Sequence, residues 1–455
     1  MSTKTSGPSL PKVAGRVIGP DDPEYDKART SFYGGFDNRP AAIVRVANAQ
    51  DVSRLISFAR ESATELVVRS GGHGVAGYAV PNGSIVLDLK DMHALEIDVK
   101  TRTAWAETGL TAVEYTTAAG AHGLATGFGD TGSVGIGGIT LGGGVGYLGR
   151  KCGLTIDDLL AADVVTADGQ LLRVDAETHP DLFWAIRGGG GNFGVATRFR
   201  FRLHEVGTIV GGMLMLPATA EVIQGFIALA EAAPEELTTI ANVMPAPPMP
   251  MVPAEQHGKL VIFGMLCYAG GVDAGERAVA PFRALATPIV DMVKPCRYPE
   301  MYPPEDESYH PIATGRTLFI DSVDRAVATT IVEHLGATDA MMRVAQLRVL
   351  GGAMARVPVE ATAFAHRRSR IMVNCAALYE RTDQEPLYAP WVNGFAAALK
   401  QSDGGAYVNF LNDEGPARIR AAYPGATWDR LRKIKARYDP RNFFRLNQNI
   451  PPATV

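Results

Sequence analysis

Cysteine is scarce in this chain, with 4 among 455 residues, and no two of them form a CxxC pair. Four scattered thiols are too few for a disulfide framework. The histidines are equally dispersed, so we expect no structural zinc and no other metal site. Small cross-linked or zinc-stabilised proteins are therefore excluded. The cysteines are Cys152, Cys267, Cys296 and Cys375.

Long apolar runs and a large net charge are also lacking. No stretch of about 18 apolar residues occurs, and the N-terminal MSTKTSGPSLPKVAG has no apolar core of a secretory signal. The net charge of −4 gives no electrostatic footprint for nucleic acid or an anionic membrane. We therefore expect a cytoplasmic protein that binds neither, and the sequence carries no signal for its oligomeric state.

Glycine, in contrast, is abundant, and many of its 49 residues gather in three clusters. In the first, LVVRSGGHGVAGYAV (66–80), a strand-like run leads into a glycine loop with no helical pattern immediately after it. Adjacent glycines can take positive φ and expose consecutive N–H groups, which makes a concave site for phosphate. His73 then lies at the tip of this loop, although an ordinary turn histidine fits the same pattern.

The second cluster is GFGDTGSVGIGGITLGGGVGYLGRKCG (127–153), and the third is RGGGGNFG (187–194). Glycine is unfavourable in helices and in strands, so this density predicts neither a coherent helix nor a plain strand over 127–153. It predicts backbone that lies close to a cofactor or to a second strand. A dinucleotide is large enough to touch all three clusters.

The pattern of elements changes along the chain. Helical and strand-like runs alternate up to about residue 206, whereas KLVIFGMLCYAG, VAQLRVLGGA and SRIMVNCAALYE, further on, are separated by helical stretches. This predicts an antiparallel sheet with helices on one face, and hence an α+β fold. Gln346 and Arg348 share one face of a strand by the period of two. They are either substrate contacts or part of a solvent-exposed face without a specific role.

Six motifs occur in this order: RPAAIVR (39–45), VVRSGGH (67–73), VGIGGITLGGGVGYLGRKCGLTIDDLL (134–160), FWAIRGGGGNFGV (183–195), YVNFL (407–411) and YDPRNFFRLNQNI (438–450). Together they resemble the berberine-bridge-enzyme-like branch of the vanillyl-alcohol oxidase and p-cresol methylhydroxylase flavoproteins. The resemblance implies a two-part FAD-binding domain, residues 1–205 and 401–455. Between the two parts it places a substrate domain, residues 206–400, with an antiparallel sheet backed by helices.

The same resemblance implies that FAD is attached covalently through His73. Neutral imidazole is a competent nucleophile towards the flavin 8α-methyl group. Many relatives carry a second link through a cysteine where this chain has Thr131, whose hydroxyl is too weak a nucleophile, so we expect one bond only. Cys152 is interpreted as a small packing residue. The other residues expected to contact the cofactor are Arg69, Ser70, Gly71, Gly72, Gly74, Thr131, Val134, Gly135, Gly137, Gly138, Gly142, Gly144, Gly194, Val195 and Asn447.

The resemblance also implies a reaction. Tyr407 is expected to assist removal of a substrate proton as hydride leaves for flavin N5, with Gln346 and Arg348 as further candidates. A phenol with pKa ≈ 10 needs a stabilised phenolate or a proton relay for this role, and a half-buried strand tyrosine is the alternative interpretation. Val134 stands where valine is typical of relatives that react with O2.

We therefore expect an FAD-dependent oxidase that acts on a carbinol or amine carbon of a small organic substrate and releases H2O2. A dehydrogenase that uses another acceptor, or a flavin-binding protein without turnover, is the alternative.

Overall fold

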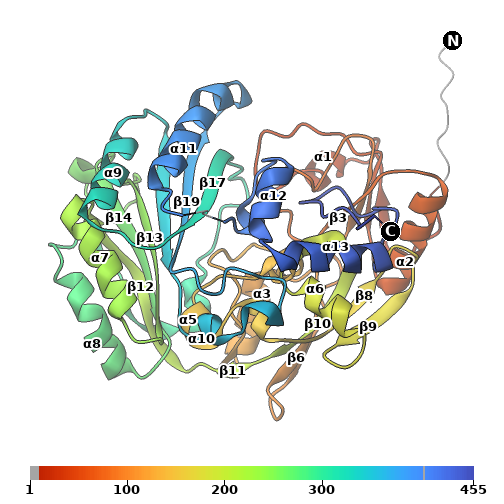
Figure 1. Ribbon diagram of the computed structural model, residues 1–455, viewed down its shortest axis with the longest axis horizontal. Coiled ribbons are helices and arrows are strands. Elements are labelled where there is room, and N and C mark those ends of the chain that lie inside the picture. The colour runs from red at the N-terminus through yellow and green to blue at the C-terminus, as the bar shows by residue number, and fades with distance from the viewer. Residues whose placement is uncertain (1–9, 403–404, 455) are drawn as a thin grey trace.

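A large antiparallel sheet lies beside a group of smaller sheets in the computed structural model, which describes residues 10–402 and 405–454 (Figure 1). The large sheet runs in the order β15-β12-β14-β13-β18-β19-β17, and β16 pairs with β12. Its strands are β12 (Thr208–Pro217), β13 (Leu237–Pro245), β14 (Leu260–Tyr268), β15 (Val290–Asp291), β16 (Lys294–Arg297), β17 (Ile312–Ile320), β18 (Met342–Val349) and β19 (Ile371–Tyr379).

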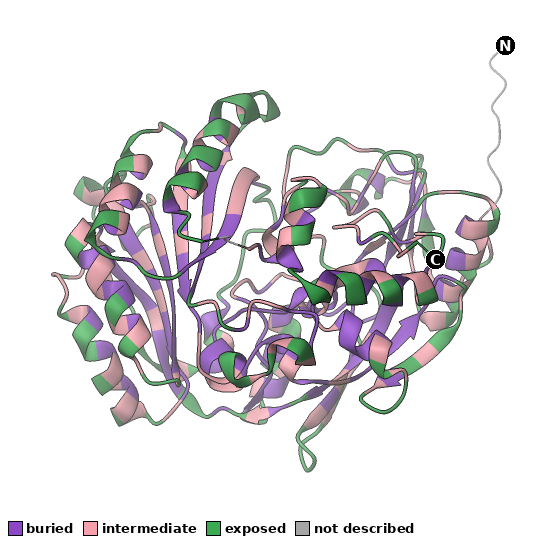
Figure 2. Ribbon diagram, viewed as in Figure 1, coloured by how far each residue is buried: buried purple, intermediate pink, exposed green. Residues whose placement is uncertain are grey.

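Four helices cover one face of this sheet. Their apolar sides share one buried cluster with alternate strand residues, and their outer sides are exposed (Figure 2). The predicted antiparallel sheet with helices on one face is thus confirmed. The helices are α7 (Ala220–Ala232), α8 (Val272–Arg283), α9 (Arg325–Gly336) and α11 (Glu385–Leu399).

Two smaller sheets form the other side of the molecule, together with the pair β7 (Leu124–Ala125) and β11 (His204–Glu205). One is ordered β1-β2-β4-β3, from β1 (Arg16–Ile18), β2 (Ala42–Arg45), β3 (Leu66–Arg69) and β4 (Ile85–Asp88). The other is ordered β5-β6-β10-β8-β9, from β5 (Leu95–Asp98), β6 (Thr103–Glu107), β8 (Leu159–Val165), β9 (Leu171–Asp175) and β10 (Val195–Arg202).

The C-terminal part of the chain returns to these smaller sheets. Helices α12 (Pro416–Ala422) and α13 (Ala426–Tyr438) share a buried cluster with α3 (Ala112–Gly120), α6 (Pro180–Ile186) and the sheet of β5 to β10. Helix α2 (Ala49–Glu61) packs on the sheet that contains β3. Two further short helices are α1 (Tyr25–Ala28) and α10 (Ala353–Arg356). Segments far apart in sequence therefore lie side by side around the glycine clusters.

The prediction that residues 127–153 form no helix is wrong. The segment contains α4 (Ile136–Gly142) and α5 (Gly149–Cys152). Glycine lowers the helix propensity of α4, but the helix packs where larger residues have no room: a Cβ atom on Gly137 would lie 2.8 Å from the Ser70 Oγ, and one on Gly142 would lie 1.9 Å from the Asn409 Oδ1. The close packing that these glycines allow therefore outweighs their low helix propensity in α4.

Among the described residues, no helix combines the length and the apolar character needed to cross a membrane.

Candidate active site

The first two glycine clusters meet backbone to backbone. A Cβ atom on Gly71 would lie 2.2 Å from the Gly135 nitrogen, and one on Gly135 would lie 2.2 Å from the Gly71 nitrogen. No side chain fits at either position, so both glycines are required for the contact. The loop after β3 and the start of α4 therefore form one wall.

Glycines from all three clusters border open space. A Cβ atom on Gly74, Gly138 or Gly191 would meet no protein atom within 4 Å. The three positions leave their sides free for a ligand, whereas Gly71 and Gly135 serve the protein's own packing.

Other predicted cofactor residues support the walls. Arg69 Nη2 donates to Asp88 Oδ2 at 2.6 Å, and Ser70 Oγ donates to the Thr108 carbonyl at 2.6 Å. These bonds hold the first loop against the ends of β4 and β6. Gly194 lies against the backbone of Val165, and Val195 is buried as the first residue of β10. The predicted glycines with a positive φ are Gly72, Gly144 and Gly194.

His73 reaches from the first loop to the second cluster. Its Nε2 lies 3.1 Å from Ser133 Oγ, and its ring stacks on Phe32 with centroids 4.2 Å apart. Burial lowers the pKa of His73 to about 4, although the nearby Glu305 carboxylate opposes the shift. The imidazole is therefore neutral near pH 7, the state that a nitrogen nucleophile needs.

Thr131 and Val134 are half-buried in the turn that leads to α4, and Val134 packs against the core of the smaller sheets. Cys152 ends α5 and packs with Tyr147, Leu148 and Cys267. Among the described residues, no three His, Cys, Asp or Glu side chains gather in a way that could hold a metal ion.

Tyr407 is buried, with 2% of its surface exposed, and its hydroxyl oxygen receives three N–H donors. Gly144 N–H donates to it at 2.9 Å, Val145 N–H at 3.3 Å and Asn409 Nδ2 at 2.9 Å. Burial raises the pKa of Tyr407, while these three donors and the positive charge of Arg348 oppose that shift. The same donors would stabilise a phenolate. Tyr407 precedes a short 3₁₀ turn and is not part of a strand, so the strand alternative is wrong.

Gln346 and Arg348 lie on the face of β18 that turns away from the covering helices. Arg348 is only 4% exposed, so the solvent-exposed alternative is wrong for this residue. Its guanidinium donates to Asp130 Oδ2 at 2.8 Å, to Gln346 Oε1 at 2.8 and 3.0 Å, and to the Val145 carbonyl at 3.3 Å. Through the Val145 carbonyl, Arg348 thus holds the peptide segment whose N–H groups donate to the Tyr407 hydroxyl oxygen.

Uncharged amides continue this polar face across the sheet. Asn242 on β13 lies opposite Gln346, which in turn lies opposite Asn374 on β19. Gln346 Nε2 donates to Asn242 Oδ1 at 2.8 Å, and Asn374 Oδ1 is buried without a described partner. The side chains of this row can donate and accept hydrogen bonds, and none of them carries a charge.

The C-terminal amides join the third glycine cluster. Asn447 Nδ2 donates to the Gly191 carbonyl at 3.2 Å, and Asn192 Nδ2 donates to the Gln448 carbonyl at 3.1 Å. The side-chain oxygens of Asn447, Gln448 and Asn449 are buried and have no partner among the described residues. A group of buried amide oxygens of this kind calls for a hydrogen-bonding ligand.

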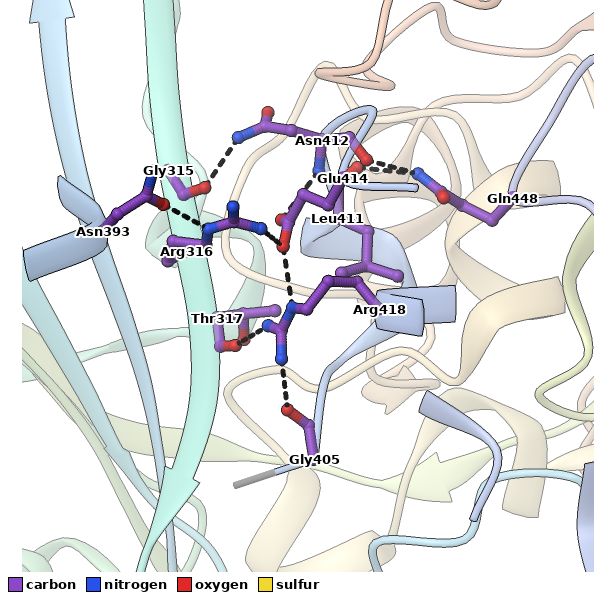
Figure 3. Close-up of polar contacts among 10 residues, drawn as sticks. All are labelled: Gly315, Arg316, Thr317, Asn393, Gly405, Leu411, Asn412, Glu414, Arg418 and Gln448. Atoms are coloured by element: carbon purple, nitrogen blue, oxygen red, sulfur yellow. Dashed lines mark hydrogen bonds and ion pairs between the residues drawn. The ribbon is translucent and has the colours of Figure 1, made fainter. Parts of the chain in front are cut away.

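An ionic cluster fastens the segment after Tyr407 to the edge of the large sheet (Figure 3). Glu414, 4% exposed in its side chain, pairs with Arg316 of β17 and with Arg418 of α12, the latter at 2.8 Å. Asn412 Nδ2 donates to the Gly315 carbonyl at 2.7 Å, and Gln448 Nε2 donates to the Asn412 carbonyl at 3.0 Å. The half of the molecule built on the large sheet and the half built on the smaller sheets are therefore linked next to Tyr407.

These residues fit FAD. Open space beside three glycine clusters suits a long dinucleotide, and the unpartnered amide oxygens can accept hydrogen bonds from its N–H groups. A neutral, half-buried imidazole stands at the same wall.

Sequence reasoning missed Ser133, Glu305, Asp130 and Glu414. Ser133 carries a weak signal, since it lies within the second glycine cluster. Glu305 accepts N–H bonds from Gly132 at 2.7 Å and from Ser133 at 3.0 Å across more than 170 positions of sequence. No local sequence pattern predicts a contact between residues so far apart in the chain.

Two family models match the chain: "FAD binding domain" over residues 40–175 and "Berberine and berberine like" over residues 406–451. The uncharacterized FAD-linked oxidoreductase YvdP of Bacillus subtilis is 32% identical over 97% of this chain and 99% of its own length. Xylooligosaccharide oxidase of Thermothelomyces thermophilus is 28% identical over 95% and 91%. The crystal structure of 6-hydroxy-D-nicotine oxidase from Arthrobacter nicotinovorans superposes with a TM-score of 0.87, at 26% identity over 97% of this chain and 99% of that one.

Proposed function

Because the chain belongs to the berberine-bridge-enzyme-like FAD-linked oxidoreductases, we propose that it is an oxidase with one covalent bond to FAD, through His73. It takes hydride from a carbinol or amine carbon of a small organic substrate to flavin N5, and O2 is the final acceptor with release of H2O2. Membership of this family makes the protein an FAD-dependent oxidoreductase and confirms the resemblance seen in the sequence. The substrate, the acceptor and the form of attachment belong to the proposal.

The observation that carries the proposal is the set of three N–H donors around the Tyr407 oxygen. When a carbinol carbon gives up its hydrogen as hydride, the hydroxyl on that carbon also has to lose a proton, and a tyrosine takes up that proton only as its phenolate, which has to be stabilised. Donors from Gly144, Val145 and Asn409 provide such stabilisation without any movement of the protein. Tyr407 is therefore the proton acceptor in our proposal.

Arg348 acts through its neighbours. Its charge favours the Tyr407 phenolate, and its bond to the Val145 carbonyl fixes the peptide segment that donates to the phenol oxygen. Since Asp130 and Gln346 already occupy the guanidinium, we assign Arg348 a positioning role, and not direct substrate binding. Gln346 remains a candidate substrate contact within the amide row.

When bound, the flavin supplies a two-electron acceptor at N5. Glycines 74, 138 and 191 leave room for it, His73 anchors it, and the amides of 447–449 provide hydrogen bonds to its polar edge. The protein's part is to place the donor carbon and exclude water.

A carbinol suits the site better than an amine. An ammonium substrate would need a free carboxylate, but Asp130 is paired with Arg348 and Glu305 with the 132–133 turn. The uncharged row of Asn242, Gln346 and Asn374 suits hydroxyl groups. The name of the xylooligosaccharide oxidase relative agrees with a hydroxylated substrate.

Stopped-flow absorbance tests the function. Candidate carbinols and amines are mixed with the enzyme without oxygen, and the reduced enzyme is then mixed with aerated buffer while peroxide is measured. Fast reoxidation with one H2O2 per flavin is expected. Slow reoxidation without peroxide favours the dehydrogenase, and no reduction by any substrate class favours the flavin-binding protein without turnover.

A further inference from the structure

A serine and a glutamate extend the contacts of His73 away from the glycine wall. His73 Nε2 lies 3.1 Å from Ser133 Oγ, and Ser133 Oγ is within hydrogen-bond distance of Glu305 Oε2. The other carboxylate oxygen, Glu305 Oε1, accepts the N–H groups of Gly132 at 2.7 Å and Ser133 at 3.0 Å. The imidazole, the hydroxyl and the carboxylate thus form a continuous chain of hydrogen bonds.

The positions of the protons in this chain follow from its chemistry. A carboxylate has no hydrogen to give, so Ser133 Oγ donates its only hydrogen to Glu305. The serine oxygen can then only accept from the imidazole, which places the imidazole hydrogen on Nε2. His73 Nδ1 is left with a free lone pair, and stacking on Phe32 fixes the plane of the ring.

We propose that Ser133 and Glu305 form a relay that activates His73 for covalent attachment of the flavin, with the bond formed at Nδ1. The inference rests on the proposed attachment through His73 and adds two residues and one atom to it. As Nδ1 attacks, positive charge develops on the ring, and a carboxylate connected to Nε2 through one hydroxyl stabilises that charge and takes up the Nε2 proton.

The step balances. A bond forms between His73 Nδ1 and the flavin 8α carbon, which loses one proton, and the imidazole loses its Nε2 proton towards Ser133 and Glu305. The two electrons released remain on the flavin ring until O2 accepts them together with two protons and leaves as H2O2. The attachment therefore needs O2 once per protein molecule.

Glu305 precedes β17 of the large sheet, whereas His73 and Ser133 belong to the glycine wall. The relay is complete only when the segment around residue 305 is docked on the 132–133 turn. Attachment thereby depends on correct contact between the two halves of the molecule.

The test measures covalent attachment and not turnover. Full-length protein produced without flavin is mixed with FAD in aerated buffer, and flavin that stays with acid-precipitated protein is followed in time. Glu305→Gln and Ser133→Ala are expected to slow attachment by at least about 100-fold. Ser133→Thr, which keeps the hydroxyl, and Glu307→Gln, at a neighbouring exposed carboxylate, are expected to stay within about threefold of the unchanged protein.

Two further measurements separate the possible failures. Non-covalent FAD binding, measured by fluorescence quenching, has to be retained in each variant; where Glu305→Gln does not fold, Ser133→Ala against Ser133→Thr decides. Unchanged protein that never retains flavin in acid overturns the covalent attachment itself. Retention at the normal rate in Glu305→Gln and Ser133→Ala, or a flavin peptide linked at Nε2, overturns the relay alone.

Discussion

Gly138→Ala is the sharpest perturbation of the cofactor site, because it separates folding from flavin binding. Gly138 lies inside α4, and a Cβ atom there meets no protein atom within 4 Å. In the protein without flavin, the change from glycine to alanine in a helix is expected to stabilise the fold by about 0.5–1 kcal/mol. No packing contact opposes this gain.

If the open space beside Gly138 belongs to the cofactor, the same substitution is expected to be unfavourable for the binding of flavin. An extra methyl group in a filled site costs about 1–3 kcal/mol, which weakens binding by roughly 5- to 150-fold. The expected result is therefore a protein that is more stable when empty and binds FAD more weakly. This opposition of signs is difficult to obtain from general damage to the fold.

The assay uses a His73→Ala parent, so that FAD binds reversibly. Unfolding by urea without FAD gives the stability, and quenching of flavin fluorescence gives the affinity. Gly394→Ala is the matched control, since Gly394 lies within α11 and its Cβ also meets open space, away from the glycine clusters. The control is expected to gain similar stability without a change in affinity.

One result would refute the reasoning. If Gly138→Ala binds FAD as tightly as its parent while Gly394→Ala behaves as expected, the space beside Gly138 is not part of the cofactor site. The glycine wall would then have to be assigned to another ligand.

Three further predictions concern chemistry, acceptor and pH. Tyr407→Phe is expected to slow flavin reduction by about 10²–10⁴-fold in anaerobic mixing, since the proton acceptor is removed, and an unchanged rate would take Tyr407 out of the mechanism. Val134→Ile is expected to slow reoxidation by O2 about tenfold or more with reduction unaffected, and equal slowing of both half-reactions would point to a packing role. Burial lowers the pKa of His366 to about 4 from 6.5, so the unfolded chain binds the additional proton and the free energy of unfolding falls as the pH drops from 6.5 towards 4. His366→Asn is expected to remove up to about 3 kcal/mol of that loss, measured by urea unfolding at several pH values.

Much of this architecture follows from local pattern. The alternation in β18 places Gln346 and Arg348 on one face, and the glycine loop after β3 follows from a strand that ends in two glycines. Both rest on periodicity and backbone freedom, which act over a few residues.

The rest depends on contacts between distant segments. The helix α4 could not be predicted because its glycines are explained only by Ser70 and Asn409, which lie elsewhere in the chain. The ion pair between Arg348 and Asp130 could not be predicted from the sequence either, since the two residues are separated by more than 200 positions. A strand's polar face can be predicted, but the partner of each side chain on it cannot.

The hydrogen bonds that join residues 191–192 to residues 447–448 have a consequence for biosynthesis. One border of the cofactor cradle exists only after the amides of Asn447 and Gln448 have emerged from the ribosome, so a nascent chain that stops short of them has an open cradle. We therefore expect the flavin to be captured late in synthesis, and a chain that terminates before residue 447 to bind it weakly.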